Sequence, residues 1–258
     1  MRVAQIILPS ASQYERKSQR ADQASLAPSF ELVDEWQAAD VAHLYAGAEL
    51  PGDLLIEVPY VSSHPMQRSR WRWRRAPEPA RVVTWRDLPE VVEDLYFAGG
   101  VPPRDTTDRS KVVGSYARPR TVNVVEQTFA RIQRFREDVV WNVFDTPPLP
   151  ADLRSVDLWV DPAVDEDDLD GFVAEAVVSG IPVVATRIEI NSARLEKGRT
   201  GFLVPPNDPN EMTHAILAAL FKSEASQAKI EAARQTAPKF RARHRLRMLS
   251  RLYEALNP

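Results

Sequence analysis

The sequence predicts an α/β protein with parallel sheets, and two adjoining patterns in its C-terminal half carry this prediction. Apolar residues recur at helix spacing between residues 169 and 177, as the stripe of a helix that lies on a sheet. Gly180 ends that helix, and Pro182 prevents its resumption. Residues 181–185 are then an unbroken apolar run, typical of a parallel strand covered on both faces. A helix that feeds such a strand is half of a Rossmann-like unit.

The N-terminal half carries weaker signals for a second unit of this kind. The predicted elements are a core strand at residues 3–8, a helix-compatible stretch at 11–30, and strands at 39–47, 54–58 and 81–85. This set is thin for a Rossmann-like half. We therefore expect a reduced N-terminal domain over residues 1–100.

Residues 99–110 are rich in turn formers and predict the linker into a C-terminal domain, residues 101–258. The elements predicted there are strands at 111–116, 139–144 and 156–160, a helix at 121–136, the helix and strand described above, a second short strand, and helices at 209–222, 224–236 and 240–257. Asp208, Pro209 and Glu211 supply the N-cap, the first-turn proline and the carboxylate that start a helix.

Two packing predictions follow from these patterns. Val183 and Val184 are expected to be fully buried on a central strand of a parallel sheet. The terminal helix is expected to dock on the body of the protein through Leu249, Leu252 and Leu256, which share one helix face.

Composition excludes several classes of protein. The chain of 258 residues has no cysteine, so disulfides and thiolate metal sites are excluded, and its four histidines are scattered without metal-ligand spacing. No apolar run approaches the roughly 18 residues of a membrane span, and the apolar start is too short for a signal peptide. We therefore expect a cytoplasmic protein. The net charge of -3 says little about its partners.

One contiguous stretch, residues 171–208, combines fixed residue types at fixed offsets. They are Glu175-Ala176, Gly180, Pro182-Val183-Val184-Ala185-Thr186, Gly198, Gly201-Phe202-Leu203-Val204 and Pro206-Asn207-Asp208. This pattern resembles the donor-domain signature of group 1 (retaining, GT-B) glycosyltransferases. The resemblance implies a GT-B-like fold of two Rossmann-like halves. A full enzyme of this family usually exceeds about 300 residues, so the N-terminal, acceptor-side half is expected to be cut down.

The resemblance also implies a donor site. A nucleotide-activated sugar would lie between the two halves, with Glu175 bonded to the ribose hydroxyls and Asp167 to hydroxyls of the sugar. The backbone around Thr186 and Arg187 would line the nucleotide pocket. Enzymes of this family generally need no metal or other cofactor, because the nucleotide sugar is itself the substrate.

A cation is expected beside the diphosphate of the donor. The departing diphosphate gains negative charge in the transition state, and a fixed guanidinium lowers that barrier. Arg118 or Arg120, which follow the strand at 111–116, take this role from their position alone, because the arginine and lysine spacing of the family is not reproduced.

The sequence departs from the family at the donor site. Asp167 stands where the family has a glutamate, and the glycine pair that follows the strand at 181–185 is replaced by Glu189 and Ile190, whose bulk and charge would obstruct a diphosphate. An acidic run also crowds the site: Asp165, Glu166, Asp167, Asp168 and Asp170. Two like charges ~4 Å apart cost about 4 kcal/mol at an effective dielectric of 20, so donor binding should be weak unless arginines or a cation offset them.

The acidic run has two other interpretations. Carboxylates at a helix N-terminus are stabilised by the helix dipole and often do no more than that. The tripeptide Asp165-Glu166-Asp167 also resembles the D-x-D metal motif of a different glycosyltransferase architecture.

A second charged segment, Arg68–Arg75, alternates arginine and tryptophan at strand period. It could be a structural edge strand that buries Trp71 and Trp73. It could instead place those rings in the interface of the inner membrane beside a lipid-linked acceptor, or bind another protein chain. Nucleic acid is not expected as a partner.

Two functions remain open from the sequence. The first is a glycosyltransferase that passes a sugar from a nucleotide-sugar donor to an unknown acceptor with retention. The second is a transferase-like protein without catalytic activity that serves as a binding or assembly subunit.

Overall fold

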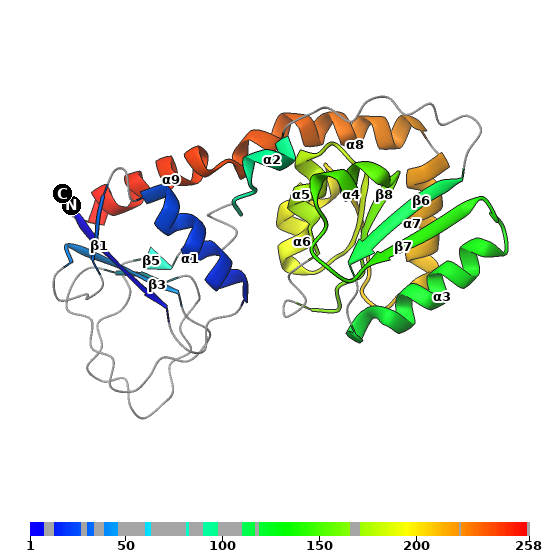
Figure 1. Ribbon diagram of the computed structural model, residues 1–258, viewed down its shortest axis with the longest axis horizontal. Coiled ribbons are helices and arrows are strands. Elements are labelled where there is room, and N and C mark those ends of the chain that lie inside the picture. Colours follow the sequence, from blue (N-terminus) through cyan, green and yellow to red (C-terminus); the bar gives the residue numbers. More distant parts are fainter. Residues whose placement is uncertain are drawn as a thin grey trace. The chain divides into compact units, whose positions relative to one another are not determined.

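The computed structural model (Figure 1) describes residues 1–7, 13–26, 30–33, 39–45, 60–62, 81–82, 90–97, 110–116, 119–165, 171–221 and 223–256. The chain divides into two compact units. Unit 1 comprises Met1–Val91 and Arg241–Pro258, and unit 2 comprises Val92–Phe240. The boundaries expected from the sequence differ in two respects. They end the N-terminal domain at residue 100, whereas unit 2 begins at Val92. They also assign the terminal helix to the C-terminal domain, whereas its contacts assign it to unit 1.

Unit 1 contains a parallel sheet in the strand order β2-β1-β3-β4-β5. The strands are β1 (Arg2–Ile7), β2 (Glu31–Val33), β3 (Val41–Tyr45), β4 (Tyr60–Ser62) and β5 (Arg81–Val82). Three of them, β1, β3 and β5, overlap predicted strands, and all five run parallel to their neighbours. The predicted strand at 54–58 lies outside the described residues.

Two helices that are far apart in the sequence pack together in unit 1 (Figure 1). They are α1 (Gln13–Leu26) and α9 (Ala242–Leu256). Leu249 and Leu252 of α9 lie in one apolar cluster with Val3 and Leu26, and Leu256 packs against its edge. The predicted packing face of α9 is therefore confirmed, and the surface that it covers belongs to the N-terminal sheet.

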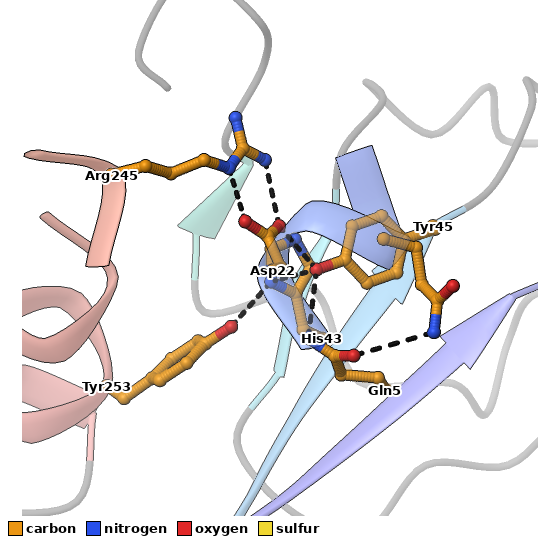
Figure 2. Close-up of polar contacts among 7 residues, drawn as sticks. Gln5, Asp22, His43, Tyr45, Arg245 and Tyr253 are labelled. Carbon is orange, nitrogen blue, oxygen red and sulfur yellow. Dashed lines mark hydrogen bonds and ion pairs between the residues drawn. The ribbon is translucent and has the colours of Figure 1, made fainter. Parts of the chain in front are cut away.

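A buried polar network joins α9 to the rest of unit 1 (Figure 2). Nε and Nη2 of Arg245 both donate to the carboxylate of Asp22, and the bond from Nη2 is 2.8 Å long. The hydroxyl of Tyr45 donates to the same carboxylate at 2.6 Å. His43 Nδ1 lies 2.6 Å from the hydroxyl of Tyr253 on α9. Because every one of these groups is at most 3% exposed, each needs its partner to offset the loss of water.

Unit 2 contains a second parallel sheet, in the order β10-β9-β8-β6-β7. Its strands are β6 (Lys111–Tyr116), β7 (Val139–Phe144), β8 (Leu158–Asp161), β9 (Val183–Thr186) and β10 (Phe202–Val204). Strand β9 pairs in parallel with both β8 and β10, and Val183 and Val184 are 1% and 0% exposed. The prediction for this strand is confirmed.

Helices cover both faces of the unit 2 sheet, and side chains alternate between them. Trp159 of β8 packs into the cluster formed with α5 (Val173–Val178), α8 (Ser223–Thr236) and the short helix Ala237–Phe240. Its neighbour Leu158 packs into the opposite cluster. That second cluster is covered by α3 (Val122–Gln133) and α7 (Pro209–Phe221). This alternation is the period of a strand buried on both sides.

Short helices complete unit 2. They are α2 (Asp94–Phe97), α4 (Pro150–Ser155), α6 (Glu189–Arg194), and the 3-10 turns Pro119–Thr121 and Glu196–Gly198. Helix α4 is not among the elements predicted from the sequence. Pro150 occupies the first helical turn, where its missing N–H costs nothing, and the Asp152 carboxylate accepts from the amide of Leu149 at 2.8 Å.

Candidate functional site

The strand order of unit 2 identifies the edge at which a ligand is expected. From β6 the chain moves to β7 on one side, and then to β8, β9 and β10 on the other. The direction of winding therefore reverses between β6 and β8. Open parallel sheets bind their ligands at the carboxyl ends of the strands at such a switch point. The segments that follow Tyr116 of β6 and Asp161 of β8 thus form the rim of the candidate site.

An arginine and an aspartate bridge this switch point. Arg120 lies in the 3-10 turn that follows β6, and Asp165 lies in the segment that follows β8. Arg120 Nη1 donates to Asp165 Oδ1 at 2.9 Å, and Nη2 donates to Oδ2 at 2.5 Å. Their side chains are 50% and 44% exposed. An arginine therefore offsets one charge of the acidic run, whereas Arg118 and Asp167 lie outside the described residues.

A buried carboxylate that sequence reasoning missed supports the rim. Asp161 ends β8 with 2% exposure and accepts from Asn191 Nδ2 of α6 at 2.8 Å. A Cβ on Gly171 would lie 2.3 Å from Asp161 Cγ, so only glycine allows this approach. Trp159 Nε1 also donates to the Gly171 carbonyl at 2.6 Å. An aspartate directly after an apolar strand run was the available signal.

Glu175 lies in the first turn of α5 and is buried, with 5% exposure. The ribose-binding role implied for Glu175 requires a carboxylate that is open to a ligand, whereas this structure buries it. The reason is that α5 contacts the sheet and the helices α2, α6 and α8, so residues 173–177 are all buried. The predicted stripe described one apolar face, whereas the helix is covered on several sides. It also begins at Val173, later than predicted, because Phe172 adopts a left-handed conformation with φ 52°.

Thr186 and Arg187 follow β9 and have different surroundings. The Thr186 hydroxyl is buried and donates to the Ala163 carbonyl at 2.6 Å, which ties the end of β9 to the segment after β8. Arg187 is exposed, and its Nη2 donates to the Leu203 carbonyl of β10 at 3.2 Å. The side chain of Arg187 is thus directed to the β10 side of the sheet, whereas Arg120 bridges β6 and β8.

The two residues that replace the glycine pair of the family also differ. Ile190 is only 2% exposed, so its bulk fills the core and does not project into the site. Glu189 is exposed at the start of α6. Ile190 therefore does not obstruct a ligand at the surface, whereas the exposed negative charge of Glu189 can still repel a diphosphate.

A pocket of about 690 Å³ lies beside the edge strand β10. Charged and aromatic groups in its lining include Arg187, Lys197, Phe202, Glu211 and Lys229. Lys229 donates to the Gly198 carbonyl and lies 4.8 Å from the centre of the Phe202 ring, and burial lowers its pKa. Neither residue of the switch-point ion pair contributes to this lining, so the pocket and the switch point are separate features of unit 2.

The segment that carries the switch point matches a known family. Residues 97–221 match the family model described as "Glycosyl transferases group 1". The resemblance found in residues 171–208 is therefore confirmed by this match. No sequence among the curated proteins matches the chain.

Solved structures extend the likeness to the whole fold. A glycosyltransferase from Rickettsia africae ESF-5 aligns with TM-score 0.63 and 11% identity over 99% of this chain and 98% of that one. The lipopolysaccharide outer core galactosyltransferase WaaB in its apo form aligns with TM-score 0.61 and 10% identity, covering 97% and 98%. HepE of Anabaena, in complex with UDP and glucose, aligns with TM-score 0.58 and 12% identity, covering 99% of each chain. The expected GT-B-like α/β fold is confirmed.

Two further properties concern the described part of the chain. None of its helices is long and apolar enough to cross a membrane. Among those same residues, no three histidine, aspartate or glutamate side chains gather closely enough to hold a metal ion.

Proposed function

We propose that the protein is a glycosyltransferase that moves a sugar from a nucleotide-sugar donor to an acceptor with retention. The observation that carries this proposal is Arg120 at the switch point, within the segment that matches the group 1 family. A guanidinium there can form paired hydrogen bonds to phosphate oxygens and offset the charge that develops on a departing diphosphate. The crystal structure of HepE contains UDP and glucose, which agrees with this donor class.

The proposed roles of the other residues follow from the resemblance. Glu175 would bind the ribose hydroxyls and Asp167 the hydroxyls of the transferred sugar. The backbone at Thr186 and Arg187 would line the nucleotide pocket, and Arg118 would assist Arg120. Since Glu175 is buried in the described structure, ribose binding requires that α5 or its surroundings move to admit the ligand. We propose no cofactor besides the donor, and a cytoplasmic location, which fits a chain without cysteine.

A second function has specific observations in its favour. Glu189 places an exposed charge where the family has glycine, Asp165 occupies the guanidinium of Arg120, and Glu175 is buried. A transferase-like subunit that binds or assembles with a partner without transferring sugar would tolerate all three.

Ligand-induced stabilisation separates the two functions. We expect one class of nucleoside diphosphate and its sugar conjugate to raise the melting temperature, because a ligand at 100 times its Kd stabilises a protein by about 2.7 kcal/mol. Arg120→Gln should abolish that increase. Arg136→Gln is the matched control: Arg136 is a partly exposed arginine paired with Asp138 just before β7 begins, at the opposite edge of the sheet.

Turnover completes the test. Slow release of free sugar from the stabilising nucleotide sugar, lost in Arg120→Gln and kept in Arg136→Gln, is the result expected of a transferase. If no nucleotide or nucleotide sugar stabilises the protein, the transferase proposal fails and the subunit remains.

A further inference from the structure

We propose that Asp165 masks the donor site: it holds Arg120 in a closed ion pair that the diphosphate of the donor must open in order to bind. This inference rests on the proposed function and adds a regulatory contact to the same site. Asp165 would act through Arg120 and would not itself touch the donor.

The geometry of the pair supports competition for one binding surface. Nη1 and Nη2 of Arg120 each donate to a different oxygen of Asp165, at 2.9 and 2.5 Å. This forked arrangement is the one by which a guanidinium binds two oxygens of a phosphate. The nitrogens that a diphosphate would use therefore already have a carboxylate in front of them.

The position of the pair makes the exchange relevant to the site. It joins the segment after β6 to the segment after β8, which are neighbouring parallel strands at the reversal of winding. Any ligand bound at this switch point meets Arg120 and Asp165 together. An ion pair elsewhere on the surface, such as Arg136 with Asp138, has no such relation to the strand ends.

The exposure of the pair makes the replacement of Asp165 by a diphosphate energetically accessible. Both side chains are about half exposed, and ion pairs of this kind are weak because water screens the charges. A diphosphate carries more negative charge than one carboxylate and offers more oxygens, so it should displace Asp165 from the guanidinium of Arg120. It must first displace Asp165 and tolerate the charge of that residue, which lowers its affinity. Ligands without a diphosphate lack the group that opens the pair.

Binding measurements on four proteins test this inference. The probes are UDP and inorganic pyrophosphate, which shares the diphosphate but has no base, with uridine as the uncharged control. The proteins are the wild type, Asp165→Asn, Arg120→Gln and the double variant, compared by calorimetry at constant ionic strength. Asp165→Asn should bind both diphosphates up to about fivefold more tightly, because a carboxylate that competes for the guanidinium in an exposed ion pair is removed.

The double-mutant cycle distinguishes displacement from simple charge repulsion. In the Arg120→Gln background, Asp165→Asn should tighten binding by no more than about twofold, since only the long-range repulsion is then relieved. Asp165→Glu, which keeps a carboxylate for Arg120, should stay near the wild-type affinity, and uridine should bind all variants alike. Far-UV circular dichroism checks that each variant is folded. Asp165→Ser is a second neutral variant, to be used if Asp165→Asn does not fold.

Several results would overturn the inference. Equal gains with and without Arg120 would reduce Asp165 to a general source of negative charge. Weaker diphosphate binding by Asp165→Asn would mean that Asp165 orients Arg120 for the donor. Absence of diphosphate binding in both the wild type and Asp165→Asn would also refute it. If the wild type binds UDP and releases sugar from a nucleotide sugar, and the diphosphate affinity of Asp165→Asn equals that of the wild type, the proposed function stands and only the masking role of Asp165 is refuted.

Discussion

Asp22 and Arg245 form an ion pair across 223 positions of the sequence, and their side chains are 0% and 4% exposed. The pair fastens α9 to α1 at the centre of the network in Figure 2. Removing both charges from water is costly, so each of them depends on the other, and Asp22 also accepts a hydrogen bond from the hydroxyl of Tyr45. The position of α9 in unit 1 is therefore fixed by its buried polar contacts as well as by its apolar face.

Removal of one partner of this pair should loosen unit 1. Asp22→Asn removes the carboxylate that pairs with the buried Arg245, and breaking a buried ion pair costs about 3–5 kcal/mol in comparable cases. We expect faster hydrogen exchange in α1, β3 and α9, together with a lower urea midpoint for unit 1. Replacing both residues, as in Asp22→Leu with Arg245→Met, should cost less than either single change.

The control for this prediction is Arg136→Ala, which removes a partly exposed ion pair from unit 2. It should leave hydrogen exchange in unit 1 unchanged. Wild-type exchange rates in α9 of Asp22→Asn would contradict the role given to the pair.

His43 should make the stability of unit 1 depend on pH. Burial lowers its pKa from 6.5 to about 4, because desolvation disfavours the imidazolium. Between those values the unfolded chain binds a proton that the folded unit excludes, so the free energy of unfolding falls as the pH falls. The contribution is complete above pH 6.5, and about 3 kcal/mol of it is lost on reaching pH 4.

The measurement compares wild type with His43→Gln, which keeps a polar atom for Tyr253 but does not titrate. Urea unfolding of both proteins at several pH values cancels the contributions of all other groups. The wild type should lose more stability than the variant between pH 6.5 and 4. Parallel profiles would show that His43 is not excluded from protonation.

Gly171 should tolerate no side chain. In Gly171→Ala the new Cβ would meet the Asp161 carboxyl at 2.3 to 2.5 Å, so the segment must move away from β8. We expect a lower melting temperature and loss of the nucleotide-induced stabilisation. Gly180→Ala is the comparison, because it has the strained φ of 74° but no atom within 4 Å of the new Cβ. Gly180→Ala should lower the free energy of unfolding by only ~1–2 kcal/mol, the cost of a left-handed backbone conformation at a residue with a Cβ, and it should keep nucleotide binding.

The segment Arg68–Arg75 lies outside the described residues, and its proposed contact with a membrane surface stays a prediction. If the protein uses a membrane-bound acceptor, it should co-sediment with anionic vesicles and dissociate as salt is added. Each exposed arginine contributes about 1 kcal/mol near such a surface. Arg70→Ser with Arg72→Ser should weaken retention, and neutral vesicles serve as the control. No retention by anionic vesicles would leave a structural strand or a protein partner for the segment.

Local patterns predicted the regular elements well. Strands β6 and β7 begin and end at the expected residues, because each is a short apolar run bounded by polar or turn-forming neighbours. The start of α7 was equally clear from Asp208, whose carboxylate accepts from the amides of Asn210 and Glu211 at 3.0 Å. These features depend on interactions within a few residues, which the sequence shows directly.

Features that depend on distant residues could not be predicted in the same way. No pattern near α9 shows that Arg245 will meet Asp22, so the helix was assigned to the wrong half of the chain. Arg120 was proposed from its position after a strand, but its pairing with Asp165 depends on the order of strands in the sheet. The burial of Glu175 likewise follows from the helices packed around α5, which one helical period does not reveal.

The division of unit 1 into two sequence segments has a consequence for synthesis. Strands β1 and β3 leave the ribosome early, whereas α9, which completes their apolar core, is made after the whole of unit 2. Unit 2 is continuous and can fold as it emerges. At about 5–20 residues per second, the N-terminal sheet waits on the order of ten seconds for its last helix. During that interval the apolar cluster of unit 1 lacks Leu249, Leu252 and Tyr253, so unit 1 can close only after α9 has been translated.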